Sequence, residues 1–413
     1  MTSMAATHAR DKRLQDAIFG ASAACREAAE KYGAEAVTNA TIGVMMDDAG
    51  KLACLPTVER VYKSLPMNDL IAYAPISGLP EYLRAATALT FGEHAPEGYT
   101  AATATAGGTG AIRQAAANYA EKGDTVLTTD WFWGTYNVIC RELGVNLDTF
   151  TLFDDKLAFN LAAFESKLAE ILGKQDSILI ILNTPAHNPT GFSLSEGDWE
   201  NVLAALKKHA AAGKKISVLV DVAYIDFGGE QESTRRFMQK FSHLPENILI
   251  MFAFSMSKGF TFYGQRTGAL IALSSSKAVI DEFAEVSKYS GRATWSNINR
   301  GAMTLLTRIQ GDATVLKAYE KERDDFYRLI RKRGDIFVSE AKECGLTALP
   351  YQGGFFLSVP TKRAKEVCEK LHDDLIFAVP LKLGVRVAAC SVSAAKMKGV
   401  AAKMKKAMEA VGE

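Results

Sequence analysis

Cysteine is scarce in this sequence, long apolar runs are absent and the net charge is close to zero. The six cysteines are scattered and form no Cys-x-x-Cys pair, so we expect reduced thiols, no disulfide framework and no metal site. A formal net charge of +1 does not indicate nucleic acid or an acidic membrane as a partner. The longest apolar runs have the length of a strand, far short of a membrane span. Residues 1–13 are polar and lack the apolar core of a signal peptide, so the sequence predicts a cytoplasmic protein.

The chain is long and apolar enough for a large core. Its 413 residues are 48% hydrophobic and 23% charged, which predicts two domains or three. Strand-like runs alternate with helical segments through the middle of the chain, and this predicts an α/β fold with a parallel sheet covered by helices on both faces. Residues 16–31 have the spacing of a helix. Residues 302–338 predict one long helical region, whose charged run at 321–325 is expected to face solvent mostly.

The most informative polar stretch follows a buried strand predicted over 248–254. Ser255, Ser257 and Lys258 come at its end, and Arg266 returns after a short loop. Poor solvation and the nearby arginine disfavour the ammonium form, so we expect the lysine pKa to lie below its usual value of about 10.4. A partly neutral lysine attacks carbonyl groups, while two hydroxyls and a guanidinium suit a phosphate dianion. Pyridoxal 5′-phosphate combines an aldehyde with a phosphate. From this stretch alone, a loop lysine beside solvated serines fits equally well.

Two weaker signals lie earlier in the chain. A glycine-rich turn over 105–110, which contains Thr109, opens an alanine-rich helix that reaches about Ala120. In one interpretation, the free N–H groups of this turn bind an anion. In the other, the glycines only allow the helix to pack tightly against the sheet. A strand over 125–128 is followed by aromatic residues that include Trp133. An aromatic side chain beyond a strand's carboxyl end either covers a flat ring or belongs to the core.

Further polar residues stand at the ends of predicted strands, where ligands bind in parallel sheets. Asp221 directly follows an apolar run, which is costly unless a structural arginine or a protonated ring nitrogen pairs with it. Tyr224 comes three residues later, and Asn188 offers a fixed amide. Arg386 lies inside an apolar strand and needs an acidic partner or an anionic ligand. Gly43 either lets the backbone approach a ligand or ends an ordinary strand.

In these residues taken together, the sequence resembles the fold-type I pyridoxal phosphate aminotransferases, in the aspartate and aromatic aminotransferase branch. The similarity covers nearly the whole chain. It is carried by residues 39–51, the loop at Tyr73, residues 107–110, residues 188–191, Asp221 with Tyr224, residues 255–258 through Arg266, residues 292–297, and Arg386. The resemblance implies a large domain over 49–325 with a mostly parallel seven-stranded sheet, and a smaller α+β domain from 1–48 and 326–413.

The resemblance also implies a role for each matched residue. Lys258 would hold the cofactor covalently and then move the substrate's α-proton, and Asp221 would pair with the protonated ring nitrogen. Tyr224 and Asn188 would hydrogen-bond the cofactor's phenolic oxygen, and Trp133 would stack on its ring. The phosphate would be held by Gly108, Thr109, Ser255, Ser257 and Arg266, and by Tyr73 of a second subunit, so a homodimer is expected. Arg386 would bind the substrate's α-carboxylate, a partner's Arg292 its distal carboxylate, and Gly43, Trp133 and Asn188 would also contact the substrate.

The activity implied is ping-pong transfer of an amino group from aspartate or an aromatic amino acid to 2-oxoglutarate. Two residues depart from the family pattern, since Tyr136 stands where a histidine is usual and Gly107 where a serine is frequent. A pyridoxal phosphate lyase or decarboxylase of the same fold is one alternative, although Arg292 and Arg386 are spaced for two carboxylates. A non-catalytic pyridoxal phosphate-binding regulator is another, although neither terminus has the room or basic charge of a DNA-binding module.

Overall fold

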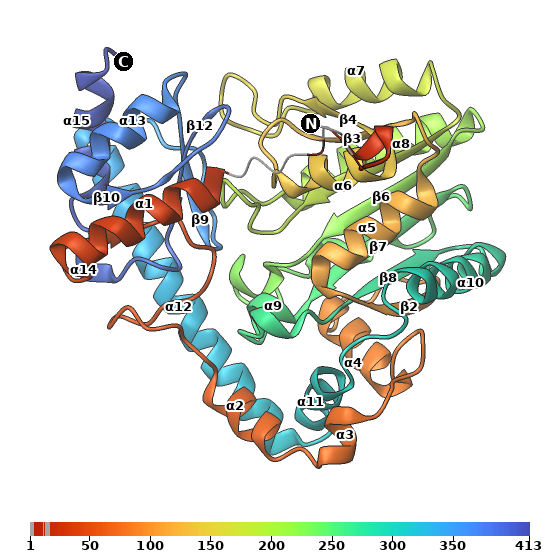
Figure 1. Cartoon of the computed structure of the whole chain (residues 1–413). Coiled ribbons are helices and arrows are strands. Elements are labelled where there is room, and N and C mark those ends of the chain that lie inside the picture. Colours follow the sequence, from red (N-terminus) through yellow and green to blue (C-terminus); the bar gives the residue numbers. More distant parts are fainter. Residues whose placement is uncertain (1–3, 11, 13–16) are drawn as a thin grey trace.

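A seven-stranded sheet lies at the centre of the structure, a computed structural model that describes residues 4–10, 12 and 17–413. β8 runs antiparallel to β2 and β7, and the other adjacent strands pair in parallel, so the sheet is mostly parallel, as predicted. Figure 1 shows its twist. The strands follow in the order β2 (Tyr99–Thr105), β8 (Gly268–Ser274), β7 (Ile248–Ser255), β6 (Lys215–Asp221), β5 (Ser177–Asn183), β3 (Thr125–Thr129) and β4 (Asn146–Phe150).

Helices cover both faces of this sheet because its central strands are apolar on both sides. Ile180 of β5 belongs to the core on one face and Ile181 to the core on the other, and the neighbouring strands repeat the alternation. One face is covered by α5 (Gly107–Tyr119), α6 (Thr135–Leu143) and α10 (Lys277–Thr294). The other is covered by α2 (Pro56–Lys63), α4 (Pro80–Phe91), α7 (Leu161–Leu172), α8 (Glu196–Ala211) and α11 (Arg300–Gln310), with α3 (Met67–Ile71) packed on α11.

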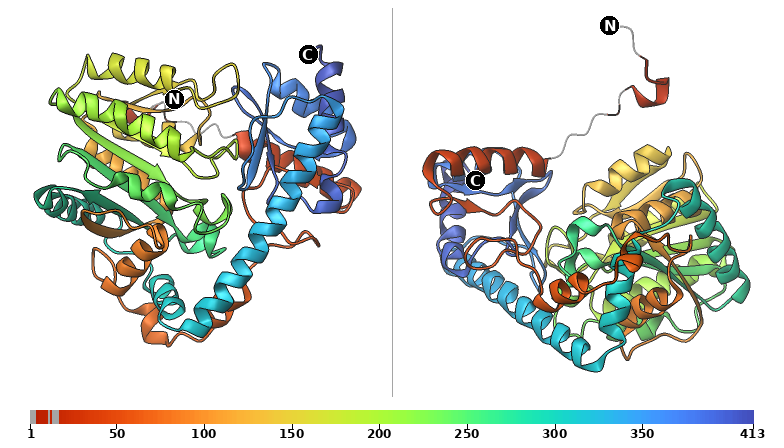
Figure 2. Two further views of the ribbon diagram at one scale, coloured as in Figure 1. Left: turned by 180° about the vertical axis from the view of Figure 1, so that it is seen from behind. Right: turned by 60° about the horizontal axis from the view of Figure 1, so that its bottom comes forward.

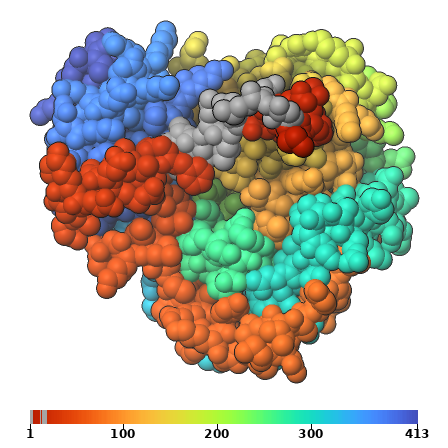
Figure 3. Space-filling view, viewed as in Figure 1, coloured from red at the N-terminus to blue at the C-terminus, as the bar shows by residue number. Residues whose placement is uncertain are grey.

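A second group of elements comes from the two ends of the chain (Figures 1 and 2). One small sheet joins the two ends of the chain, because β1 (Thr38–Asn39) pairs with β10 (Ile376–Phe377). A second, three-stranded sheet comes from the C-terminal part alone and consists of β11 (Val379–Pro380), β12 (Gly384–Ala388) and β9 (Phe356–Pro360). The helices of this group are α1 (Ala17–Tyr32), α13 (Ala364–Leu371), α14 (Ala394–Met397) and α15 (Val400–Ala410). In the space-filling view of Figure 3, α1 and the C-terminal elements form one continuous surface.

A long helix, α12 (Ala313–Cys344), connects the two groups. Tyr319 near its start packs into the core of the large sheet, while Ile330 and Phe337 pack into the core of the terminal elements. The helix therefore continues without a break through residue 325, where the large domain was predicted to end. The division into 49–325 and the two terminal segments stays a prediction.

The long helical region predicted over 302–338 is interrupted once in the structure. It consists of α11 and α12, and between them Asp312 caps α12 by accepting hydrogen bonds from the N–H groups of Thr314 and Val315. Within its charged run at 321–325, which was expected to face solvent mostly, Arg323 alone is buried: it is 1% exposed and lies 3.7 Å from Asp226. Of the helix predicted over 16–31, residue 16 lies outside the described residues.

Within the described ranges, no helix is long and apolar enough to cross a membrane.

Candidate active site

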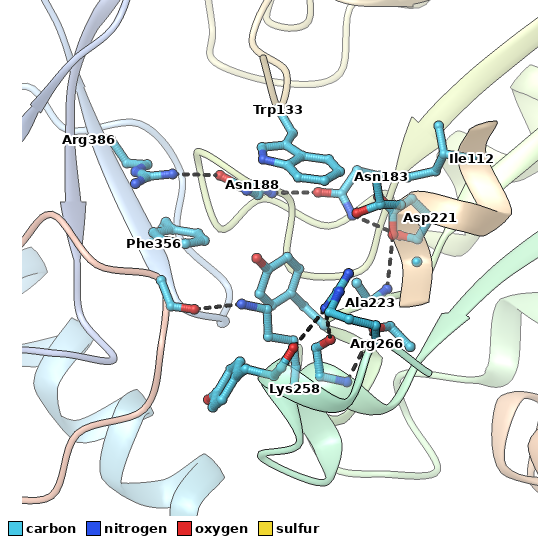
Figure 4. Close-up of a pocket in the computed structure, with 17 residues that line it drawn as sticks. Ile112, Trp133, Asn183, Asn188, Asp221, Ala223, Lys258, Arg266, Phe356 and Arg386 are labelled. Atoms are coloured by element: carbon cyan, nitrogen blue, oxygen red, sulfur yellow. Dashed lines mark hydrogen bonds between the residues drawn. The ribbon is translucent and has the colours of Figure 1, made fainter. Parts of the chain in front are cut away.

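A pocket of about 220 Å³ lies where β5, β6 and β7 end and α5 begins (Figure 4). This is the sheet edge at which the sequence predicted a ligand. Every predicted site residue lines it except Tyr73 and Arg292. The predicted residues that the structure brings together are Gly43, Gly108, Thr109, Trp133, Asn188, Asp221, Tyr224, Ser255, Ser257, Lys258, Arg266 and Arg386.

Lys258 lies in α9 (Met256–Gly259), the single helical turn that follows β7. Its Nζ donates a hydrogen bond to the carbonyl oxygen of Gly43 at 2.5 Å and lies 5.1–5.4 Å from the ring centres of Tyr224, Tyr263 and Phe355. Burial lowers the pKa of this amine to about 8, and the nearby guanidinium groups of Arg386 and Arg266 act in the same direction, while Asp221 opposes them. A substantial fraction of Lys258 is therefore a neutral, nucleophilic amine near pH 8.

Asp221 ends β6 with its carboxylate inside the pocket wall, 5% exposed. One carboxylate oxygen accepts a hydrogen bond from the Tyr136 hydroxyl at 2.6 Å, and the other accepts from the Ala223 N–H at 3.1 Å. Burial raises the pKa of Asp221, and these two hydrogen bonds act in the opposite direction. Tyr136, the residue in place of the usual histidine, therefore contacts the carboxylate directly.

Donors suited to an anion gather at one end of the pocket. Arg266 donates through Nη1 to the Ser257 hydroxyl at 3.2 Å and to the Tyr263 carbonyl at 2.8 Å, which holds its guanidinium in place. Ser255 caps α9 beside it, and the first turn of α5 contributes Gly108 and Thr109. A helix start, two serines and a guanidinium form a phosphate-binding arrangement.

Arg386 lies on the opposite side of the pocket in Figure 4, within β12. Its guanidinium donates to Asn188 Oδ1 at 3.3 Å and to the Thr41 carbonyl at 3.0 Å, and its Cζ lies 4.2 Å from the centre of the Phe356 ring. Gly43 permits this arrangement, because a Cβ there would lie 2.8 Å from the Phe356 ring. These contacts orient a buried cation toward the pocket.

Five lining residues were not predicted. Asn183 ends β5 directly beside Asp221, so its signal, a polar residue after an apolar run, was the one that identified Asp221. Phe356 and Tyr263 are aromatic residues whose place on the pocket wall depends on how distant segments meet. The five residues are Ile112, Asn183, Ala223, Tyr263 and Phe356.

Tyr73 and Arg292 lie outside this chain's pocket. Tyr73 is 87% exposed, and Arg292 is exposed in the last turn of α10, where its Nη1 donates to the Ser296 hydroxyl at 2.6 Å. Their expected roles belong to a second subunit and stay predictions. Among the described side chains, no cluster of three or more His, Cys, Asp or Glu could hold a metal ion.

The polar groups that line the pocket fit pyridoxal phosphate. Phosphate donors surround Arg266, the buried Asp221 carboxylate suits a protonated ring nitrogen, and the Trp133 indole lines the same pocket. Lys258 reaches the same space with a partly neutral amine, as an aldehyde requires. The fold and the site together define a fold-type I pyridoxal phosphate protein.

Comparison with known proteins identifies the family. The sequence pattern described as aminotransferase class I and II matches residues 35–404, so the chain belongs to this family, whose members depend on pyridoxal phosphate. The structure is similar to that of an aminotransferase from Anaerococcus prevotii, with a TM-score of 0.96, 39% identity and 98% of each chain covered.

Two curated relatives are more distant. The aromatic-amino-acid aminotransferase of Paracoccus denitrificans is 30% identical over 62% of this chain and 63% of its own length, somewhat less than two thirds. The aspartate aminotransferase of Salmonella typhi is 27% identical over 74% of this chain and 77% of its own. The family and fold predicted from the sequence are confirmed.

Proposed function

We propose that this chain is an amino-acid transaminase that moves an amino group from aspartate or an aromatic amino acid to 2-oxoglutarate by a ping-pong mechanism. The observation that carries the proposal is the position of the Lys258 amine. It lies in one pocket with a phosphate-binding arrangement, a buried carboxylate and a buried arginine. The relatives named for aspartate and for aromatic amino acids support both donor classes.

Lys258 is the residue proposed to move the proton. When bound, pyridoxal phosphate supplies an electron-withdrawing ring that stabilises negative charge on the substrate's α-carbon. The Lys258 amine, with its pKa lowered to about 8 by burial, can then take the α-proton and return it at another atom. The Gly43 carbonyl, which accepts a hydrogen bond from Nζ, holds the amine on this side of the pocket.

The remaining pocket residues orient the two ligands. Asp221 would face the ring nitrogen, and Trp133 would cover one face of the ring. Tyr224 and Asn188 would donate to the phenolic oxygen, and the Asn188 Oδ1 already accepts a hydrogen bond from Arg386, which leaves its Nδ2 as the donor. Arg386 would bind the substrate's α-carboxylate through its guanidinium.

A homodimer completes the proposal. Tyr73 does not line this chain's pocket, and it is exposed together with two apolar side chains shortly before it, Met67 and Ile71. Exposed apolar side chains grouped in this way favour association. Two copies joined here would place Tyr73 and Arg292 at the partner's pocket, as the family resemblance implies. The six cysteines, all free, support a cytoplasmic location.

An experiment with ¹⁵N-labelled amino acids tests this function. The purified enzyme loaded with pyridoxal phosphate receives ¹⁵N-aspartate or ¹⁵N-phenylalanine together with 2-oxoglutarate. We expect ¹⁵N-glutamate in an amount equal to the oxo acid formed from the donor. Release of carbon dioxide or ammonia without labelled glutamate would instead indicate a decarboxylase or a lyase on the same fold.

A further inference from the structure

Tyr136 lies directly behind the pocket, in the first turn of α6, and is 1% exposed. Its hydroxyl donates to Asp221 Oδ2 at 2.6 Å, while Asp221 Oδ1 accepts from the backbone N–H of Ala223. Each carboxylate oxygen thus has one fixed donor, and both donors are neutral. These donors hold the carboxylate in one orientation. Because they are neutral, they do not offset its negative charge.

The ring of Tyr136 supports a second wall of the same pocket. It packs edge-to-face against the Trp133 indole, with ring centres 5.8 Å apart, and lies nearly parallel to Phe132 at 6.4 Å. The Tyr136 N–H also donates to the Trp133 carbonyl at 2.9 Å. One side chain therefore contacts both the carboxylate at the pocket's end and the aromatic ring on its wall.

We infer that Tyr136 is a positioning residue that fixes Asp221 against the ring nitrogen of the cofactor and Trp133 against the ring face. The inference rests on the proposed function and extends it to a residue that does not itself line the pocket. Tyr136 would act through Asp221 and Trp133 and would touch neither substrate nor cofactor.

The chemistry of a phenol explains why this position tolerates tyrosine. Burial raises the pKa of Tyr136 well above 10, so it remains a neutral donor throughout the physiological range. A neutral donor stabilises the carboxylate by a hydrogen bond and leaves the full negative charge for a cationic ring nitrogen. An imidazole, which titrates near neutral pH, would share that charge whenever it is protonated.

Cofactor affinity separates this role from a purely structural one. Apoenzymes of the wild type, Tyr136→Phe and Tyr136→His are titrated with pyridoxal phosphate and with its analogue in which CH replaces the ring nitrogen. Tyr82→Phe is the matched control, because Tyr82 is also fully buried and its hydroxyl has no partner among the described residues. Near-ultraviolet circular dichroism of the bound cofactor reports the orientation of its ring.

In Tyr136→Phe we expect pyridoxal phosphate to bind about 10- to 100-fold more weakly, the loss of one hydrogen bond to a charged group. The nitrogen-free analogue should bind wild type and variant equally, Tyr136→His should recover most of the affinity, and Tyr82→Phe should match the wild type. Equal weakening of both ligands, or of neither, would overturn the inference.

If Tyr136→Phe does not fold, Tyr136→His carries the same comparison. An imidazole beside Asp221 titrates near neutral pH, so in a folded Tyr136→His the affinity for pyridoxal phosphate relative to the analogue should change with pH in a way that it does not in the wild type. A pH profile equal to that of the wild type would overturn the inference. Neither outcome bears on nitrogen transfer by the wild type, so the proposed function fails or stands separately.

Discussion

A β-carbon on Gly107 would lie 2.6 Å from Nη2 of Arg266, and Gly107 itself has a positive φ of +68°. The glycine at this position, where the family frequently has serine, therefore makes room for the guanidinium at the phosphate end of the pocket. Arg266 also has a positive φ, +50°, so two unusual backbone conformations face each other across this contact.

This contact predicts that Gly107→Ala weakens cofactor binding. The new β-carbon displaces Arg266, and we expect the affinity for pyridoxal phosphate to fall about 10- to 100-fold, the equivalent of one hydrogen bond to a charged group. Gly123→Ala is the control, because Gly123 has a φ of +93° but open space around it. Both variants should lower the melting temperature, and only Gly107→Ala should lose affinity. Equal affinity in the two variants would mean that Arg266 does not need this space.

The buried amine predicts a pH dependence. Only neutral Lys258 attacks an aldehyde, so the rate at which apoenzyme combines with pyridoxal phosphate should rise with pH and level off above about 8. Stopped-flow absorbance from pH 6 to 10 measures this rate. A midpoint near the usual lysine value of about 10.4 would contradict the effect of burial. Lys258→Ala, which lacks the amine, should show no such rise.

Removing Asp221 should impair catalysis more than folding. Truncating one partner of a buried, hydrogen-bonded charge pair costs about 2–5 kcal/mol, and at about 1.4 kcal/mol per tenfold we expect Asp221→Ala to lose about 30- to 3000-fold in kcat/KM. The variant should keep the circular dichroism spectrum of the wild type. Near-wild-type rates would rule out Asp221 as the partner of the ring nitrogen.

Arg386 should matter equally for every substrate. Lysine at this position keeps the charge but loses both the fork geometry and the stacking on Phe356. We expect Arg386→Lys to lower kcat/KM for aspartate and for phenylalanine alike, by about 10- to 100-fold. A loss confined to one donor would assign Arg386 to the side chain of the substrate instead of its α-carboxylate.

Arg292 should distinguish substrate classes. A guanidinium binds a distal carboxylate through two hydrogen bonds, each contributing about 1.5–3 kcal/mol, so Arg292→Leu should lower kcat/KM for aspartate by roughly 10²–10⁴. Half-reactions with phenylalanine or tyrosine should fall much less. Lys288→Leu, an exposed cation on the same helix, is the control. An equal fall for both classes would mean that Arg292 serves dimer structure.

Much of the site could be predicted because polar residues at the ends of apolar runs are visible in a sequence. Asp221 and Ser255 end β6 and β7, and the fold necessarily brings such positions to one edge of the sheet. Asn183 shows the same signal at the end of β5 and could have been found by it.

Other features depend on contacts between distant segments. Phe356 lines the pocket only because β9 comes to lie opposite Gly43. In the sequence, two adjacent phenylalanines indicate only a hydrophobic core. Tyr136 could be recognised as a replacement, but its hydrogen bond to Asp221 required the structure. Arg323 is buried beside Asp226, which lies almost one hundred residues away in the sequence. The helical pattern around Arg323 carries no information about that contact.

The central claim is that Lys258 holds the cofactor, and chemical labelling tests it most directly. Borohydride reduction of the enzyme loaded with pyridoxal phosphate fixes the cofactor on the lysine that carries it, and peptide mass spectrometry then locates that lysine. We predict one labelled peptide, modified at Lys258, and a Lys258→Ala enzyme that still binds the cofactor without forming product. A label on any other lysine, or turnover by Lys258→Ala, would contradict the account.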